Sequence, residues 1–329
     1  MQSVTLAVPE ERVRPASARP PADTAYRAVA RASGVLTLTL MALIGLFLVI
    51  RSWDALHAIG WSFFTTSAWF PDTGVFGVWG ALLGTFLIAI IALVLAVPVA
   101  ICAALFVTEY APARLRRPLT SFIDVLAAIP SIIYGLWGRA YLEPKAIYLS
   151  RWIGTHFGFL PFFKTDEPHN VGSYSASTFI AGMVVALMIV PICTAVMREV
   201  FAQAPAGEKE GALALGGTRW GVIKTVVLPF GRGGIIGGSM LGLGRALGET
   251  IAVTLLISPL FDPHSLTHVL HSGGISIASL IALKFSESND FGISALMAAG
   301  LTLFVITLIV NALAGIIVAR SRSGAATEI

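Results

Sequence analysis

The chain has 329 residues, of which 56% are hydrophobic and only 12% are charged, with a formal net charge of +4. An average soluble domain carries about 25% charged residues, so the composition excludes a soluble enzyme, a nucleic-acid-binding domain and a disordered protein. It suits a protein whose surroundings are membrane lipid.

Long apolar stretches predict an all-α membrane protein, because a helix needs about 20 apolar residues to cross a bilayer core. The six expected spans are about Ala32–Ile50, Gly77–Val107, Leu119–Trp137, Ser177–Met197, Ile235–Pro259 and Ile293–Ala319. Residues 1–31 are rich in Pro, Ala and Arg and are expected to form a flexible tail. Residues 32–75 are expected to hold the first transmembrane helix and an outer loop.

Basic residues predict the orientation of the spans. About 15 Lys and Arg fall on the side that carries both termini, and 6 fall on the other side. Cytoplasmic loops carry the excess of positive charge in membrane proteins, so both termini are expected in the cytoplasm, including the tail at 320–329. The chain is therefore a multi-pass protein in contact with membrane lipid.

The cytoplasmic loop between the fourth and fifth spans, about residues 198–232, contains a short predicted helix. Glu208 and Glu210 lie where acidic side chains favour a helix N-terminus, and Gly216 and Gly217 end the helix. Such a helix would either insert into a groove on a cytoplasmic partner or lie on the membrane as a connector. The composition and the helix pattern leave both possibilities open.

The order of residues in this loop is more specific. It resembles the EAA loop of bacterial ABC-importer permeases, although Gly211 and Val226 depart from that pattern. In that family the loop docks on an ATP-hydrolysing subunit. The resemblance implies that the coupling residues are Glu208, Glu210, Ala212, Gly216, Leu228 and Pro229.

ATP hydrolysis is not expected of this chain itself. A P-loop requires Gly-Lys-Ser or Gly-Lys-Thr, and no lysine of this sequence follows a glycine. The chain is therefore predicted to be a transport subunit without enzyme activity and without a cofactor. ATP and Mg²⁺ would be bound by a partner ATPase.

Arg245 lies near the middle of the fifth predicted span, where a charge costs about 2.5–3.5 kcal/mol. Glu249 follows one helical turn later, and Gly238 and Gly242 share the same predicted face. One interpretation is close helix packing through the glycines, with the two charges forming a self-neutralising pair. The other, which we favour, is a substrate path, because the planar guanidinium of Arg suits a tetrahedral oxyanion.

Two long strings of residues, found in this order, resemble the PstC permeases of bacterial phosphate importers. They are Ala127-Ala-Ile-Pro-Ser-Ile-Ile-Tyr-Gly-Leu-Trp-Gly138 and Gly242-Leu-Gly-Arg-Ala-Leu-Gly-Glu-Thr250. The resemblance covers about residues 76–319 and implies a MetI-like ABC permease core in the bacterial inner membrane. It also implies three partners, which are a PstA-like second permease, a PstB-like ATPase dimer and an extracytoplasmic PstS-like phosphate-binding protein.

The sequence therefore predicts the permease subunit of an ATP-driven phosphate importer that works by alternating access. The resemblance assigns the charged transport positions of that family to Arg245 and Glu249. One alternative is the same machine serving sulfate or molybdate. Another is a membrane scaffold that relays phosphate status to a sensor.

Three further features have open roles. His264, His268 and His271 have the spacing of a metal site on a helix, but an exposed polar stripe is the preferred interpretation, so no metal site is predicted. Asp124 is expected to be solvated or to pair with an arginine of the loop between the second and third spans. Arg139 would either attract phosphate or anchor the chain at the membrane interface.

Overall fold

The structure, a computed structural model, describes residues 21–165, 169–258 and 268–321, and these residues are mostly helical. The described residues form two units, 21–47 and 48–321. The first unit is the larger part of helix α1 (Pro21–Ile59), and nearly all of its side chains are exposed. Such an exposed and largely apolar helix surface is typical of a segment that lies in lipid.

Helix α1 begins earlier than the sequence predicted. Its first residue, Pro21, suits the start of a helix because proline lacks the N–H that would remain unpaired there. Residues 21–31 of the expected tail are therefore helical, and residues 1–20 lie outside the described part of the chain.

A short hairpin follows α1 in the second unit. Helix α2 (Ser62–Thr65) leads into strand β1 (Trp69–Phe70), the 3₁₀ turn η1 (Pro71–Thr73) and strand β2 (Val75–Phe76). The strands pair antiparallel, with Trp69 opposite Phe76, and the two rings pack edge to face at 5.0 Å. Both rings are buried, so the hairpin holds a small apolar cluster at this end of the unit.

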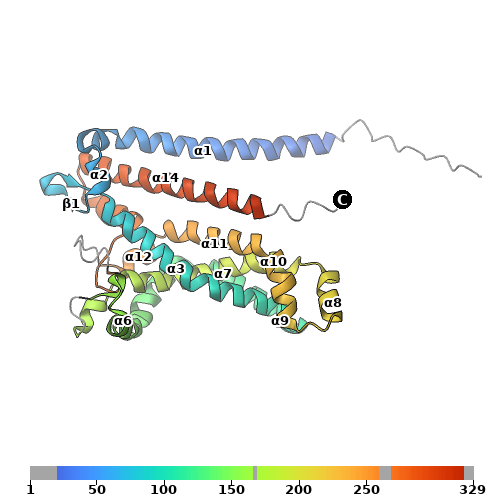
Figure 1. Cartoon of the computed structure of the whole chain (residues 1–329). Helices are drawn as coiled ribbons and strands as arrows, with labels where there is room; N and C mark the ends of the chain where they lie inside the picture. The colour runs from blue at the N-terminus through green and yellow to red at the C-terminus, as the bar shows by residue number, and fades with distance from the viewer. Residues whose placement is uncertain (1–20, 166–168, 259–267, 322–329) are drawn as a thin grey trace, which may run out of the picture. The chain divides into compact units, whose positions relative to one another are not determined.

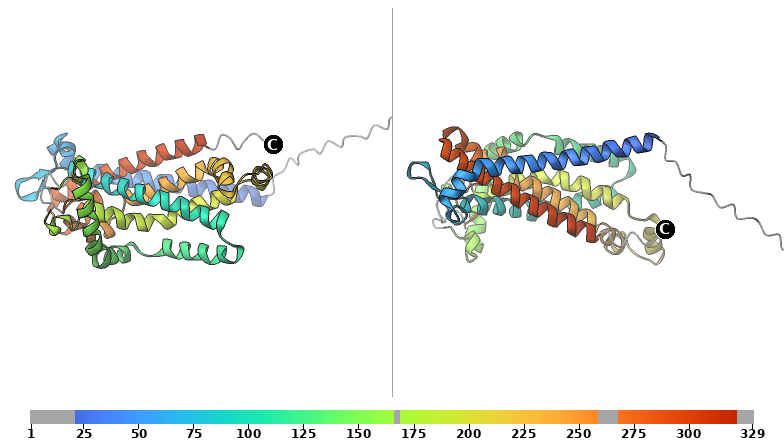
Figure 2. Two further views of the ribbon diagram at one scale, coloured as in Figure 1. Left: turned by 60° about the horizontal axis from the view of Figure 1, so that its bottom comes forward. Right: turned by 90° about the horizontal axis from the view of Figure 1, so that it is seen from above.

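Two long helices form the centre of the second unit. Helix α3 (Trp79–Leu105), with the π-helical turn η2 (Phe106–Tyr110) after it, runs beside α7 (Thr178–Ala202) in Figures 1 and 2. Alanines of α3 recur every three or four residues and are fully buried against α7. Their small side chains let the two helices approach closely, which is how helices pack in membranes.

The third predicted span, Leu119–Trp137, is not one straight helix. Helix α4 (Ala113–Ala128) ends at Ile129, and a second helical run contains α5 (Ser131–Trp137), the π turn η3 (Gly138–Leu142) and α6 (Glu143–Phe157). The two runs meet at 87°. Pro130 explains the break, because a proline forces the residue before it out of the helical conformation.

The fifth predicted span, Ile235–Pro259, is also interrupted. Helix α11 (Arg232–Leu247) ends before Gly248, and a short helix α12 (Ile251–Leu256) follows. Upstream lie α8 (Ala206–Ala214), α9 (Arg219–Val222), the π turn η6 (Ile223–Val227) and α10 (Leu228–Phe230). The run 219–230 meets α11 at 66°. Pro259 lies outside the described residues.

The remaining elements complete the second unit. The 3₁₀ turns η4 (Pro161–Phe163) and η5 (Val171–Tyr174) precede α7, and α13 (Ile277–Lys284) with the turn η7 (Phe285–Glu287) precedes α14 (Asp290–Ser321). Four helices of the described chain are long and apolar enough to cross a membrane, or up to six if each bent pair is one span. The chain is therefore a multi-pass membrane protein.

Candidate functional site

One face of α11 is a row of glycines packed against α7. Gly234, Gly238 and Gly242 are buried, and a β-carbon at Gly242 would lie 2.6 Å from the Cys193 sulfur. The Cys193 thiol also donates a hydrogen bond to the Gly238 carbonyl at 3.2 Å. These contacts support the helix-packing interpretation for the glycines, while a role of Gly238 and Gly242 in a substrate path remains a prediction.

Arg245 lies on the same arc of α11 as these glycines by helix geometry, but its side chain is exposed. It lines a pocket of about 330 Å³ together with Leu241 and Gly244 of its own helix. The other lining residues are Ile192 of α7, Met240 of α11 and Asn311 of α14. Tyr134 of α5 is also close enough to interact electrostatically with Arg245. The pocket therefore combines apolar walls with a cation, which is a setting for a small anion.

Glu249 is buried in the break between α11 and α12. Its carboxylate accepts a hydrogen bond from the backbone N–H of Ala252 at 3.1 Å and so caps α12. Within the described part of the chain, no ion pair joins Arg245 and Glu249. The self-neutralising pair, which was the less favoured of the two interpretations, is therefore not formed, because α11 ends between the two residues.

Asn311 is the functional candidate that the sequence analysis missed. It lies in α14, and its side chain lines the same pocket as Arg245. Its amide oxygen is 3.4 Å from the position that a β-carbon on Gly244 would occupy. A lone amide within the apolar stretch Ile293–Ala319 was visible in the sequence, but its neighbour in space was not.

Helix α8 is the predicted helix of the coupling loop, and the structure places its ends as expected. Glu208 lies in the first turn, and the chain leaves the helix at Gly216, whose φ of 82° favours glycine. The Gly217 N–H then donates to the Ala212 carbonyl at 3.0 Å. Glu210 is exposed, and Leu215 is 92% exposed. The acidic side chains of α8 and the apolar Leu215 directly after it are therefore exposed on the surface of this chain.

Leu228 and Pro229 lie in α10, at the bend that leads into α11. Leu228 packs against the main core, and Pro229 is exposed. Val226 and Val227 just before them are buried. The end of the predicted coupling loop is thus anchored in the core, while its start in α8 projects from it (Figure 1).

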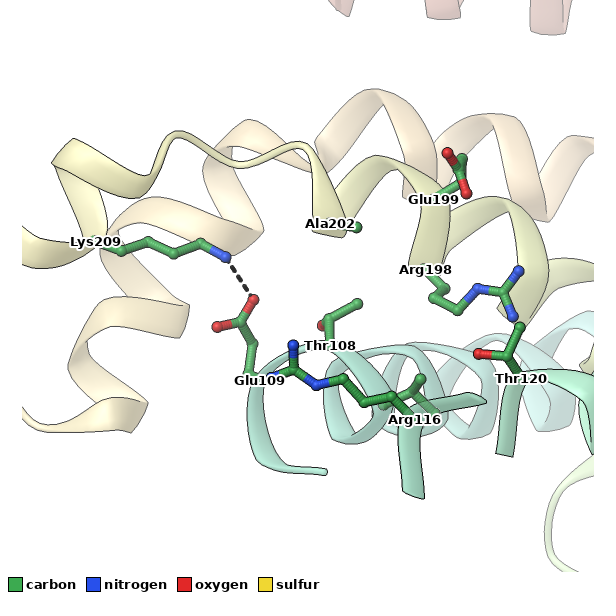
Figure 3. A pocket seen from close by; sticks show the side chains of 9 residues that line it. Thr108, Glu109, Arg116, Thr120, Arg198, Glu199, Ala202 and Lys209 are labelled. Carbon is green, nitrogen blue, oxygen red and sulfur yellow. Dashed lines mark hydrogen bonds and ion pairs between the residues drawn. The ribbon is translucent and has the colours of Figure 1, made fainter. Parts of the chain in front are cut away.

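A second pocket, of about 270 Å³, lies beside α8 and is lined by Lys209, Glu109 and Arg198 among others. The Lys209 ammonium donates to the Glu109 carboxylate at 2.7 Å and so joins α8 to the turn η2 after α3, as Figure 3 shows. Arg198 of α7 lies 3.8 Å from Asp124 of α4. Asp124 is 54% exposed and therefore solvated, which is one of its two expected settings, and its ion-pair partner is Arg198 instead of an arginine of the preceding loop.

Arg139 has a local partner. Its guanidinium donates to both oxygens of the Glu143 carboxylate, at 2.9 and 3.1 Å. Glu143 is nearly buried and also accepts from the Ala176 N–H at 3.1 Å. Arg139 thus joins η3 to the start of α6, and Glu143 joins α6 to the segment before α7. Attraction of phosphate and anchoring at the membrane interface both stay predictions for Arg139.

The histidine cluster is only partly described. His264 lies outside the described residues, and His271 contacts the carbonyl of Ser272 at 2.8 Å through its Nδ1 atom. In residues 21–165, 169–258 and 268–321, no group of three potential metal ligands comes together.

The sequence matches a family model over most of its length. Residues 96–323 match the family described as "Binding-protein-dependent transport system inner membrane component". The match includes α4 to α14, and therefore the Arg245 pocket and the coupling loop. The bent pairs and the projecting α8 thus belong to the part of the chain that this family shares.

Curated relatives are similar over nearly their full length. "Phosphate transport system permease protein PstC 2" of Mycobacterium tuberculosis is 43% identical over 295 residues, which are 88% of this chain and 89% of the relative. "Phosphate transport system permease protein PstC" of Pasteurella multocida is 41% identical over 306 residues, covering 90% and 91% of the two chains.

Solved structures show the same fold at low sequence identity. A bacterial ABC transporter involved in the import of the acidic polysaccharide alginate aligns with a TM-score of 0.51 at 16% identity, covering 90% of this chain and 99% of that one. An inward-facing MetNI methionine ABC transporter aligns with a TM-score of 0.50 at 17% identity, covering 74% and 94%. The fold is therefore that of a MetI-like ABC permease.

Proposed function

Because this chain belongs to the PstC family of phosphate transport system permeases, we propose that it is the permease subunit of an ATP-driven importer of inorganic phosphate, with Arg245 on the translocation path. The exposed guanidinium at the pocket between α11, α14 and α7 is the observation that carries this proposal. Charged groups in membrane spans are costly and usually face a path or cavity. A guanidinium offers paired N–H donors to a tetrahedral oxyanion.

The chain is a transport subunit and breaks no covalent bond, and an ABC importer requires an ATPase and a substrate-binding protein. We assign these roles to a PstB-like ATPase dimer, which binds ATP and Mg²⁺, and to an extracytoplasmic PstS-like protein. A PstA-like second permease would cover the face of α11 that carries Arg245. Both termini and α8 would lie on the cytoplasmic side of the inner membrane, as the basic residues suggest.

Alternating access follows from how α8 is connected. ATP-driven closure of the ATPase dimer would move α8, because Glu210 on this helix and Leu215 directly after it are exposed and can contact the ATPase. The Lys209–Glu109 pair would carry that motion to the end of α3, and α10 would carry it to α11. Arg245 would then face first the outside and later the cytoplasm.

Glu249 has a supporting role in this mechanism. Its carboxylate caps α12 and so fixes the break directly after the helix that carries Arg245. Gly234, Gly238 and Gly242 hold the same helix against α7. The path residue is therefore held by packing on one side and by a capped break on the other.

The test is uptake of labelled phosphate by the purified four-component complex in liposomes. Arg245→Ala should lower uptake at limiting phosphate by about tenfold to a hundredfold, the loss expected when a charged hydrogen-bonding group is removed. Arg245→Lys should recover part of it, because it keeps the charge but loses the planar fork. Arg232→Ala, an exposed arginine at the start of the same helix, is the matched control and should transport normally.

The substrate is tested in the same liposomes. Excess unlabelled sulfate or molybdate should not reduce phosphate uptake, whereas unlabelled phosphate should. Normal uptake by Arg245→Ala in an assembled complex would refute the role of Arg245. Strong competition by sulfate or molybdate would favour a permease for another oxyanion.

A further inference from the structure

Asn311 is an exposed amide on a helix that is otherwise suited to lipid. It lies in the last third of α14, and in the described part of the chain its side chain makes no hydrogen bond. Hydroxyl groups on the same helix behave differently, since Thr302 and Thr307 donate to backbone carbonyls of their own helix at 2.8 and 2.9 Å. An amide without a partner is costly in lipid, so Asn311 requires a polar neighbour outside its own helix.

The position of the amide indicates which neighbour it has. Asn311 lies over Gly244, and its amide oxygen is 3.4 Å from the position that a β-carbon on Gly244 would occupy, which is an ordinary contact distance. Gly244 directly precedes Arg245, and all three residues line the pocket of about 330 Å³. Two spans far apart in the sequence thus bring one amide and one guanidinium to a single cavity with apolar walls.

The chemistry of the two groups is complementary. Arg245 has only donors, and it attracts any oxyanion. Asn311 has an NH₂ group that donates and a carbonyl oxygen that accepts. At neutral pH inorganic phosphate retains at least one P–OH, which donates a hydrogen bond, whereas sulfate has no proton to donate. An acceptor beside the arginine would therefore distinguish the two anions.

We propose that Asn311 is a specificity-determining ligand for phosphate in the Arg245 pocket, donating through its NH₂ group to a phosphate oxygen and accepting through its carbonyl oxygen from a P–OH. This inference rests on the proposed function, because it requires that Arg245 lies on the phosphate path. It adds a residue from α14 and a physical basis for selecting phosphate over a fully deprotonated oxyanion.

The experiment compares Asn311→Leu with Thr307→Val in the intact complex. Leu has a similar volume and no polar group, so KM for phosphate uptake should rise about tenfold, and sulfate should begin to compete. Thr307 lies one turn earlier on the same helix and bonds to its own backbone, so Thr307→Val should keep the wild-type KM and selectivity.

Three results would overturn or separate the claims. Normal KM and selectivity in Asn311→Leu, with Arg245→Ala inactive, would overturn the inference and leave the proposed function intact. Normal uptake in both variants would refute both. Loss of the second permease from purified Asn311→Leu complex would show that the amide joins the subunits, and the inference would again be overturned.

Discussion

Glycines have opposite surroundings in two regions of this permease. In α11, a β-carbon on Gly234, Gly238 or Gly242 would lie within 3.2 Å of an atom of α7. In α8, a β-carbon on Gly207 or Gly211 would meet nothing within 4 Å. The absence of side chains at the α11 glycines lets α11 and α7 approach closely, whereas the α8 glycines face open space. The same residue type therefore marks a fixed part of the molecule in α11 and an unpartnered part in α8.

Gly242→Leu should have the largest effect, because it places a side chain where the Cys193 sulfur already lies 2.6 Å from the β-carbon position. Overpacking of this kind costs about 1–3 kcal/mol, and sometimes more. The thermal midpoint of the purified complex in detergent should fall, and uptake should fall with the amount of assembled complex.

A milder pair of variants tests the same contact. Gly242→Ala should be destabilising alone and should be rescued in part by Cys193→Ala, which removes the sulfur that the new methyl group meets. Gly237→Ala is the matched control on the same helix, since its nearest neighbour would be 3.9 Å away. Equal thermal midpoints for Gly242→Ala and Gly237→Ala would show that the packed face is not as tight as its geometry indicates.

Charge reversal at Lys209 should have an intermediate effect, because it breaks the only ion pair of α8 in the described chain. The 2.7 Å contact with Glu109 is partly buried, so a coupling free energy of about 1 kcal/mol is expected between the two sites. Lys209→Glu should reduce the phosphate transported per ATP hydrolysed, while binding of the ATPase persists. The double variant Lys209→Glu with Glu109→Lys should recover most of that ratio.

The size of the rescue is the informative result. The pair does not transmit motion between α8 and η2 if the double variant recovers none of the phosphate transported per ATP hydrolysed. The same follows if Lys209→Glu alone does not lower that ratio. Lys224→Glu serves as a control in the same loop, since Lys224 is exposed and makes no ion pair in the part of the chain that the structure describes. If it lowers the ratio as much as Lys209→Glu does, the overall charge of the loop matters more than the specific pair.

The sequence predicted the spans and the coupling helix because each depends on local order. Apolar runs of membrane length identified α3, α7 and α14, and the acidic start with the Gly216 end identified α8. The breaks were harder to place. Pro130 was visible but is tolerated in many membrane helices, and nothing in the order of Gly248 and Glu249 requires that α11 end there.

The sequence predicted the site residue that is conspicuous by itself. It missed the residue whose role depends on the packing of two spans. Arg245 was identified because a charge in an apolar run is conspicuous. The less favoured interpretation, a pair between Arg245 and Glu249, was wrong, because spacing of one turn implies contact only if the helix continues. Asn311 was missed because its significance depends on lying over Gly244, and only the packing of α14 on α11 reveals that.

Gly211→Ala should have the smallest effect of these changes and the opposite sign to Gly242→Ala. Alanine is about 1 kcal/mol more favourable than glycine in a helix, and a β-carbon at Gly211 meets nothing. Hydrogen exchange of amides in α8 should therefore slow by about fivefold, with uptake retained. Gly207→Ala lies in the first turn, where helix propensity counts less, and should slow exchange less. Faster exchange in Gly211→Ala would mean that this glycine has a neighbour in the assembled complex, and the contrast between the two regions would then hold only for the isolated chain.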